Sequence, residues 1–150
     1  MTYDEAVSIA SASNTSENQP FVIDKNLRTI AVPDNFLLGV NGDADVQIIP
    51  FVCPRYFNGI DLSEFSISVT FKRNIGGYDN YDSYYPDDVV VSEDSISFNW
   101  VVGQSAFYGE GTVDASIGLE YYDVGTSTAK RFGTKIITLT VADSLYAPVA

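Results

Sequence analysis

The sequence predicts an all-β protein: a single antiparallel, immunoglobulin-like β-sandwich of seven or eight strands, with an arm at each end. Segments in which apolar and polar residues alternate recur roughly every 8–15 residues, and glycine, asparagine, aspartate and proline separate them. Apart from residues 4–12, which are compatible with a short helix, no segment shows the 3.6-residue period of a helix. A small closed β-barrel is the alternative, because the same pattern fits both folds.

The composition excludes several kinds of chemistry. The 150 residues suit a single domain, and they include no histidine and one cysteine, with a net charge of −12. Histidine-dependent catalysis, an imidazole zinc site and an internal disulfide are therefore excluded. The acidic charge disfavours binding to nucleic acid phosphates or to an anionic membrane. We expect no cofactor, no metal ion and no enzyme activity.

Two terminal segments differ from the predicted domain, which spans residues 21–142. Residues 1–20 are polar and rich in serine, asparagine and alanine, so we expect an arm of weak intrinsic order. The N-terminus has acidic residues where a signal peptide has basic ones, and no apolar run is as long as a membrane span. We therefore expect neither a signal peptide nor a transmembrane segment. Residues 143–150 form a second arm, and its apolar residues are candidate interface residues: Leu145, Tyr146, Pro148 and Val149.

The first half of the predicted domain contains two strands. Residues 27–32 form a short strand that ends at Pro33, and residues 36–40 form an apolar turn segment followed by an Asn-Gly turn. Residues 46–53 form a nearly continuous apolar strand that contains Pro50. Because proline cannot donate a hydrogen bond to a neighbouring strand, we expect this strand to lie at an edge or to carry a bulge.

The second half shows the clearest alternation, in residues 66–72, 95–100, 113–122 and 137–141. The apolar positions of these strands should face inward and form a common core. Trp100 alternates with the outward-facing Ser95, Ser97 and Asn99, so it is expected in the core rather than on a ligand platform. The predicted core residues are Ile67, Val69, Phe71, Ile96, Phe98, Trp100, Val113, Ile117, Ile137 and Leu139.

Two groups of acidic residues are candidate calcium ligands. Asp43 and Asp45 lie in one turn, and the other group comprises Asp79, Asp82, Asp87 and Asp88. Neither group has the spacing of a calcium-binding loop, and turn-forming aspartates on a solvated loop explain both. With twenty acidic residues, a chance carboxylate pair is expected, so paired acids alone do not indicate a glycoside hydrolase.

The tyrosine-rich segment 78–85 is the most informative local feature. Tyrosine is enriched at protein interfaces, where it supplies a large rigid surface with a polar tip. The segment fits three interpretations: a protein interface, a strand whose tyrosines cover the sandwich edge, and a sugar-binding surface. The candidate interface residues here are Tyr78, Tyr81, Tyr84 and Tyr85.

Several anchors along residues 27–141 resemble a known family. Gly59-Ile60-Asp61-Leu62-Ser63 leads into the alternating strand at residues 67–72, and the segments at 96–100 and 111–113 follow. Together with Gly42-Asp43, Phe51 and Arg55 upstream, this pattern resembles the N-terminal β-sandwich domain of the upper baseplate protein family of tailed bacteriophages that infect Gram-positive hosts. The resemblance implies a virion component with a docking role and no catalytic residues.

The expected function is therefore that of a bacteriophage structural protein, assembled in the host cytoplasm and located in the virion. A head or tail decoration, an adaptor or the base of a fibre would all fit. Its expected partners are other virion proteins or further copies of itself, with a trimer as one form. A carbohydrate-binding adhesion module is the first alternative, and a small hydrolase with paired acids is a weaker one.

Overall fold

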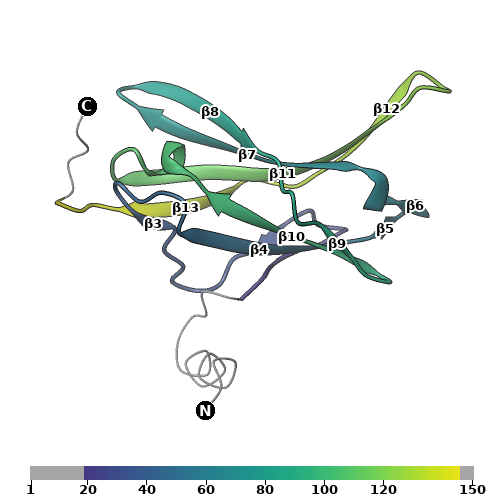
Figure 1. Ribbon diagram of the computed structural model, residues 1–150, viewed down its shortest axis with the longest axis horizontal. Helices are drawn as coiled ribbons and strands as arrows, with labels where there is room; N and C mark the ends of the chain where they lie inside the picture. Colours follow the sequence, from purple (N-terminus) through teal and green to yellow (C-terminus); the bar gives the residue numbers. More distant parts are fainter. Residues whose placement is uncertain (1–18, 146–150) are drawn as a thin grey trace, which may run out of the picture.

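The computed structural model describes residues 19–145, which form two sheets packed face to face (Figure 1). Each sheet ends in edge strands and neither closes on itself, so the barrel alternative is wrong. The described residues contain no α-helix, only the two short 3-10 turns η1 (Leu62–Glu64) and η2 (Gln104–Phe107). Within residues 19–145, no helix is long and apolar enough to cross a membrane.

The first sheet has the strand order β2-β1-β4-β10-β9. Its long central strands are β4 (Gln47–Pro54) and β10 (Ser95–Val102), which pair antiparallel over their whole length. The other three strands are β1 (Phe21–Ile23), β2 (Ile30–Ala31) and β9 (Val90–Val91).

The second sheet has the order β3-β13-β11-β7-β8, and β12 also pairs with β11. A separate small hairpin lies at one end of the molecule (Figure 1). The strands of the second sheet are β3 (Gly39–Val40), β7 (Ser66–Ile75), β8 (Tyr78–Tyr84), β11 (Gly111–Asp123), β12 (Thr128–Gly133) and β13 (Ile137–Ala142), and those of the hairpin are β5 (Tyr56–Phe57) and β6 (Ile60–Asp61).

The prediction of a purely antiparallel fold is wrong at two places. β1 runs parallel to β4, and β3 runs parallel to β13. Both exceptions arise because the chain crosses between the sheets: after β1 and β2 it enters the second sheet as β3 and returns to the first as β4. A strand that returns through the other layer has no hairpin turn to impose antiparallel pairing.

The two sheets share one hydrophobic core. Nine of the ten predicted core residues are buried, and Ile137 is partly buried against the same cluster. Trp100 of β10 is fully buried, and its ring lies 5.2 Å from that of Phe71 of β7, so this contact joins the two sheets. The core also includes residues outside the clear alternation, such as Phe21, Leu38, Phe107 and Phe132.

The expectation for the strand containing Pro50 is wrong, because β4 lies between β1 and β10 rather than at an edge. The register with β10 passes through Pro50, opposite Asn99, without a bulge. The proline is tolerated because β1 begins with Phe21 opposite Phe51, so Pro50 lies just beyond the end of β1. Because β1 does not extend to Pro50, the missing N–H of the proline costs no hydrogen bond between these strands.

Candidate functional site: the tyrosine-bearing edge

The tyrosine segment forms β8, the edge strand of the second sheet (Figure 1). β7 and β8 form a hairpin in which Ile75 pairs with Tyr78, so only Gly76 and Gly77 lie in the loop. Their φ angles are +61° and +85°. Two consecutive positive φ angles define the type I′ turn that suits a two-residue hairpin, and glycine adopts them with little strain.

The four candidate tyrosines of this segment do not share one face. Tyr78 and Tyr84 lie opposite Ile75 and Val69, on the face of the sheet toward the core. Tyr81 lies opposite Lys72 on the outer face, and Tyr85 follows the end of β8. Successive side chains of a strand point to opposite sides, so the four tyrosines do not form one continuous surface.

Three of these tyrosines are strongly exposed: Tyr78 by 77%, Tyr81 by 69% and Tyr85 by 68%. Tyr84 instead packs against the hydrophobic core and anchors the end of β8. The strand has no partner on its outer side among residues 19–145. β8 therefore presents both exposed aromatic rings and an open strand edge.

Polar side chains hold the strand in place from both faces. On the outer face, Asn74 donates to Asp79 at 3.2 Å, and the hydroxyls of Thr70 and Ser83 lie 3.3 Å apart. Asp82 lies on the inner face, where its Oδ2 accepts a hydrogen bond from Ser105 at 2.8 Å. Its Oδ1 accepts one from the backbone N–H of Ser83, also at 2.8 Å.

A hollow of about 170 Å³ opens between β8 and the first sheet. Trp100 forms part of the wall of this hollow. Its indole N–H is buried without a hydrogen-bond partner. Carboxylates and hydroxyls beside an aromatic ring are groups that can bind sugar hydroxyls. The polar residues that line the hollow are Asp45, Asp82, Ser83 and Ser105.

The remaining candidates belong to the C-terminal segment. Leu145 is the last described residue, and its side chain is fully exposed. Tyr146, Pro148 and Val149 lie outside the described residues, as does most of the predicted N-terminal arm.

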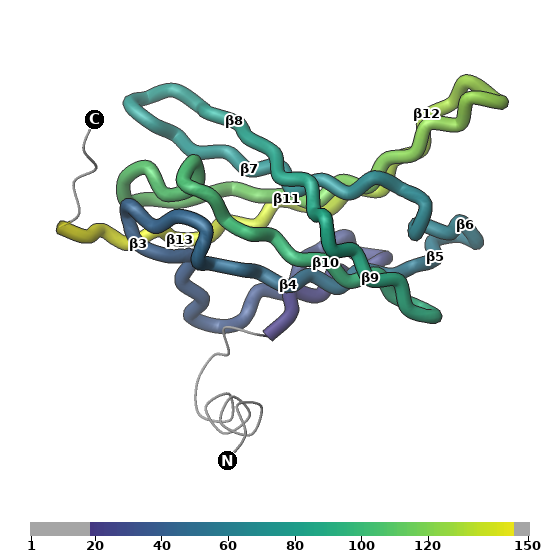
Figure 2. Tube along the Cα trace, in the orientation of Figure 1, coloured from purple at the N-terminus to yellow at the C-terminus, as the bar shows by residue number. Residues whose placement is uncertain are grey.

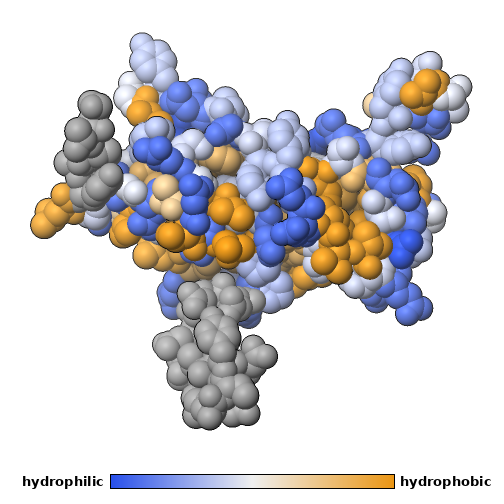
Figure 3. Space-filling view, viewed as in Figure 1, coloured by the Kyte–Doolittle hydropathy of each residue, from blue (hydrophilic) through white to orange (hydrophobic). Residues whose placement is uncertain are grey.

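A second exposed surface, which the alternation pattern does not predict, is the ribbon formed by the end of β11 and by β12. β7 accompanies β11 only as far as Glu120, so the ribbon continues beyond that point with two strands and projects from the body (Figure 2). Tyr122 and Val124 are 60% and 79% exposed, and hydrophobic atoms are visible at the far end of the ribbon in Figure 3. One sequence feature indicates this ribbon: the tyrosine pair Tyr121-Tyr122 directly precedes a polar turn segment.

A cationic hollow of about 260 Å³ lies at the base of this ribbon. The guanidinium carbon of Arg28 lies 3.9 Å from the ring centre of Phe132 and 4.5 Å from that of Phe57. Arg28 also donates to the carbonyl oxygen of Gly133 at 3.0 Å. Its stacked position shows that Arg28 joins the β1–β2 turn to β12 and β5.

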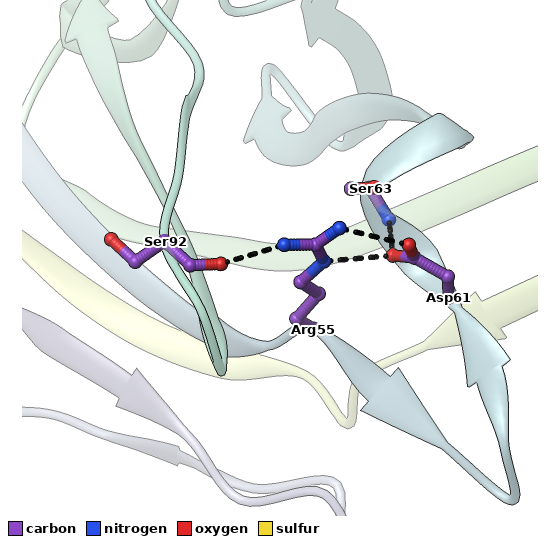
Figure 4. A network of polar contacts seen from close by, with 4 residues as sticks. All are labelled: Arg55, Asp61, Ser63 and Ser92. Atoms are coloured by element: carbon purple, nitrogen blue, oxygen red, sulfur yellow. Dashed lines mark hydrogen bonds and ion pairs between the residues drawn. The ribbon is translucent and has the colours of Figure 1, made fainter.

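The Gly-x-Asp-Leu-Ser segment, which carried the family resemblance, forms a polar clasp (Figure 4). Arg55 donates to both carboxylate oxygens of Asp61, at 3.2 and 3.1 Å, and to the carbonyl oxygen of Ser92 at 3.0 Å. Asp61 also accepts the backbone N–H of Ser63 at 3.0 Å. The hydrogen bonds from Arg55, followed by those from Ser63, hold the pKa of Asp61 well below its ordinary value. The clasp ties the end of β4 to β6 and to the chain before β10.

The acidic groups take part in local hydrogen bonding. Asp43 accepts the backbone N–H of Val40 at 3.0 Å and so closes the turn after β3. Within residues 19–145, no group of three or more acidic or cysteine side chains is arranged to hold a metal ion. The lone Cys53 is buried, which raises the pKa of its thiol to about 12.

Comparison of the chain with protein-family models gave no match, and comparison with curated proteins gave none either.

Proposed function

We propose that this chain is a non-enzymatic structural protein of a bacteriophage virion and acts by docking to other proteins. In this proposal the body is an immunoglobulin-like β-sandwich assembled into the virion from the host cytoplasm. The terminal segments and the β8 edge make the contacts. The partners are other virion proteins or further copies of the same chain.

The observation that carries the proposal is the open, tyrosine-bearing edge of β8. Proteins usually protect an exposed strand edge, because its unpaired backbone groups invite pairing with another chain. Here the edge is seven residues long, and Tyr78 and Tyr81 remain largely exposed beside it. Exposed tyrosines next to unpaired backbone groups favour a protein interface over a catalytic site.

The test is incorporation of truncated chains into phage particles. Chains lacking residues 1–20 or 144–150 should remain folded, because both deletions spare every strand within residues 19–145. We expect each deletion to abolish incorporation. As a matched control, an exposed ribbon residue, Val124, is changed to Ser, which should leave incorporation unchanged. Wild-type copy numbers for both truncated chains would contradict a docking role for the terminal segments.

The hollow beside β8 favours a second candidate function, carbohydrate binding. Asp82 and Ser105 would supply hydrogen bonds to sugar hydroxyls, with Tyr84 on the wall. A glycan array with the purified chain tests this function, and Asp82→Asn should lower any signal. Trp100 is fully buried and offers no face for stacking, so we rank this candidate second.

A further inference from the structure

The free edge of β8 exposes a defined set of backbone groups. In a two-residue hairpin, the residues that flank the loop form a hydrogen-bonded pair, and hydrogen-bonded pairs then alternate along the ladder. The register places Tyr78, Asn80, Asp82 and Tyr84 in such pairs with β7. The N–H and C=O groups of Asp79, Tyr81 and Ser83 therefore point outward. The Ser83 N–H is indeed bound by the Asp82 side chain instead of by β7.

The sequence of β8 is self-complementary when a second copy runs antiparallel to it. The strand reads Tyr-Asp-Asn-Tyr-Asp-Ser-Tyr, so reversal places tyrosine opposite tyrosine at all three tyrosine positions. Each aspartate meets a residue that can donate a hydrogen bond. The pairs are Tyr78 with Tyr84, Asp79 with Ser83, Asn80 with Asp82, and Tyr81 with Tyr81.

We propose that β8 pairs antiparallel with β8 of a second copy, about a two-fold axis that passes Tyr81. This inference rests on the proposed docking function of the same edge and names its partner and geometry. The outward backbone groups match this register, because Asp79 with Ser83 and Tyr81 with Tyr81 become hydrogen-bonded pairs. The two copies then form one continuous sheet across the axis.

Other registers fit less well. Paired residues of an antiparallel ladder lie on the same face, so the two-fold axis must pass a residue of β8. An axis at Asp79 or Asp82 places two carboxylates directly opposite each other, and like charges in that position are destabilising. Axes at the remaining positions leave part of the strand without a partner. Only the axis at Tyr81 pairs all seven residues of β8.

The side chains support the same arrangement on both faces. On the outer face, the two Tyr81 rings meet near the axis, which would bury part of a ring that is 69% exposed in one copy. On the inner face, the exposed Tyr78 meets Tyr84, which already packs against the core. On pairing, the carboxylate of Asp82 loses its hydrogen bond from the Ser83 N–H. The side-chain amide of the partner's Asn80 then donates to this carboxylate instead.

With short strands and a net charge of −12 on each copy, we expect weak, reversible pairing.

Cysteine cross-linking tests the register directly. In a hydrogen-bonded antiparallel pair the Cα atoms lie about 5.5 Å apart, a separation that a disulfide can span. Tyr81→Cys should therefore form a covalent dimer under mild oxidation. Asp79→Cys, on the same face, should not link to itself but should link to Ser83→Cys when the two are mixed. Cys53 does not interfere, because it is buried. Equal self-linking of Tyr81→Cys and Asp79→Cys, or none by either, would overturn the proposal.

A proline substitution tests the backbone contribution. Tyr81→Pro removes an N–H that points to solvent in one copy, and proline is tolerated at such positions of an edge strand. We expect self-association at least tenfold weaker in sedimentation equilibrium, with a nearly unchanged melting temperature. Unchanged association of Tyr81→Pro would also overturn the proposal.

The outcomes separate this proposal from the docking function on which it rests. If cross-linking fails while the terminal truncations still abolish incorporation, then self-pairing is wrong and docking to other virion proteins stands. If cross-linking succeeds and the truncated chains incorporate normally, then β8 pairs with itself and the terminal segments are not docking elements.

Discussion

At the scale of single residues, Trp100 shows how the two sheets are held together. It is the only tryptophan of the chain, and its buried ring contacts Phe71 of the opposite sheet. We expect Trp100→Ala to lower the free energy of unfolding by about 3–5 kcal/mol, as other large-to-small aromatic changes in cores do. Trp100→Phe should cost less, because it also removes an indole N–H that has no partner. Chemical denaturation measures both changes, and fluorescence typical of a water-exposed tryptophan would contradict the placement.

The lowered pKa of Asp61 predicts how the stability of the fold depends on pH. Because its folded-state pKa is depressed below its ordinary value of 3.8, the clasp with Arg55 stabilises the fold at pH values above about 4. That stabilisation is lost as the pH falls and the carboxyl becomes protonated. Asp61→Asn should therefore lower the melting temperature at pH 7, and the difference from the wild type should shrink below pH 4. A difference that stays constant across this range would show that the charge of Asp61 contributes nothing.

Arg73 shows what alternation predicts and what it does not. It continues the inward positions of β7 after Ile67, Val69 and Phe71, so the strand period alone directs it to the core. The sequence could not predict its partners, which are the carbonyl oxygens of Ala106, Gly109 and Glu110. Burial lowers the pKa of Arg73, but arginine stays protonated in proteins. A buried cation thus closes the loop around η2 through backbone contacts far away in sequence.

At the scale of elements, the β7–β8 turn depends on its two glycines. A Cβ at Gly77 would meet no atom within 4 Å, so the effect of a substitution there is purely conformational. Its φ of +85° makes Gly77→Ala unfavourable, by about 1–2 kcal/mol. Gly103→Ala is the matched control, because Gly103 has a φ of −83° and room for a Cβ. Thermal unfolding should show a loss only for Gly77→Ala, and equal effects would contradict the turn assignment.

The long alternating strands were predictable from sequence, and the short ones were not. β7, β10, β11 and β13 each have one buried face, and this produces the period of two. β1, β2 and β3 have only two or three residues, too few to show a period. β12 was missed because most of its residues are exposed on both faces of the ribbon. Parallel pairing and the position of β8 at an edge depend on the path of the whole chain.

At the scale of the whole molecule, the net charge of −12 opposes any contact between copies. Screening is weak at low ionic strength, where the Debye length is about 30 Å at 0.01 M salt compared with about 8 Å at 0.15 M. We therefore expect the dissociation constant of self-association to rise severalfold when salt is lowered between these values. Sedimentation equilibrium measures the change. Tighter association at low salt would instead indicate that complementary charges drive the contact.

The most direct test of β8 as the assembly edge is amide hydrogen exchange as a function of protein concentration. The amides of Asp79 and Tyr81 point outward in one copy and become hydrogen-bonded donors in the proposed pair, whereas the amide of Ser83 is already bound by the Asp82 side chain in one copy. Those of Asn80 and Asp82 are bound to β7 in either state, and that of Thr126 lies in the ribbon loop, far from the contact. We predict that exchange at residues 79 and 81 slows as the concentration rises, while exchange at residue 126 stays fast. Exchange at Tyr81 that is equally fast at all concentrations would contradict the account.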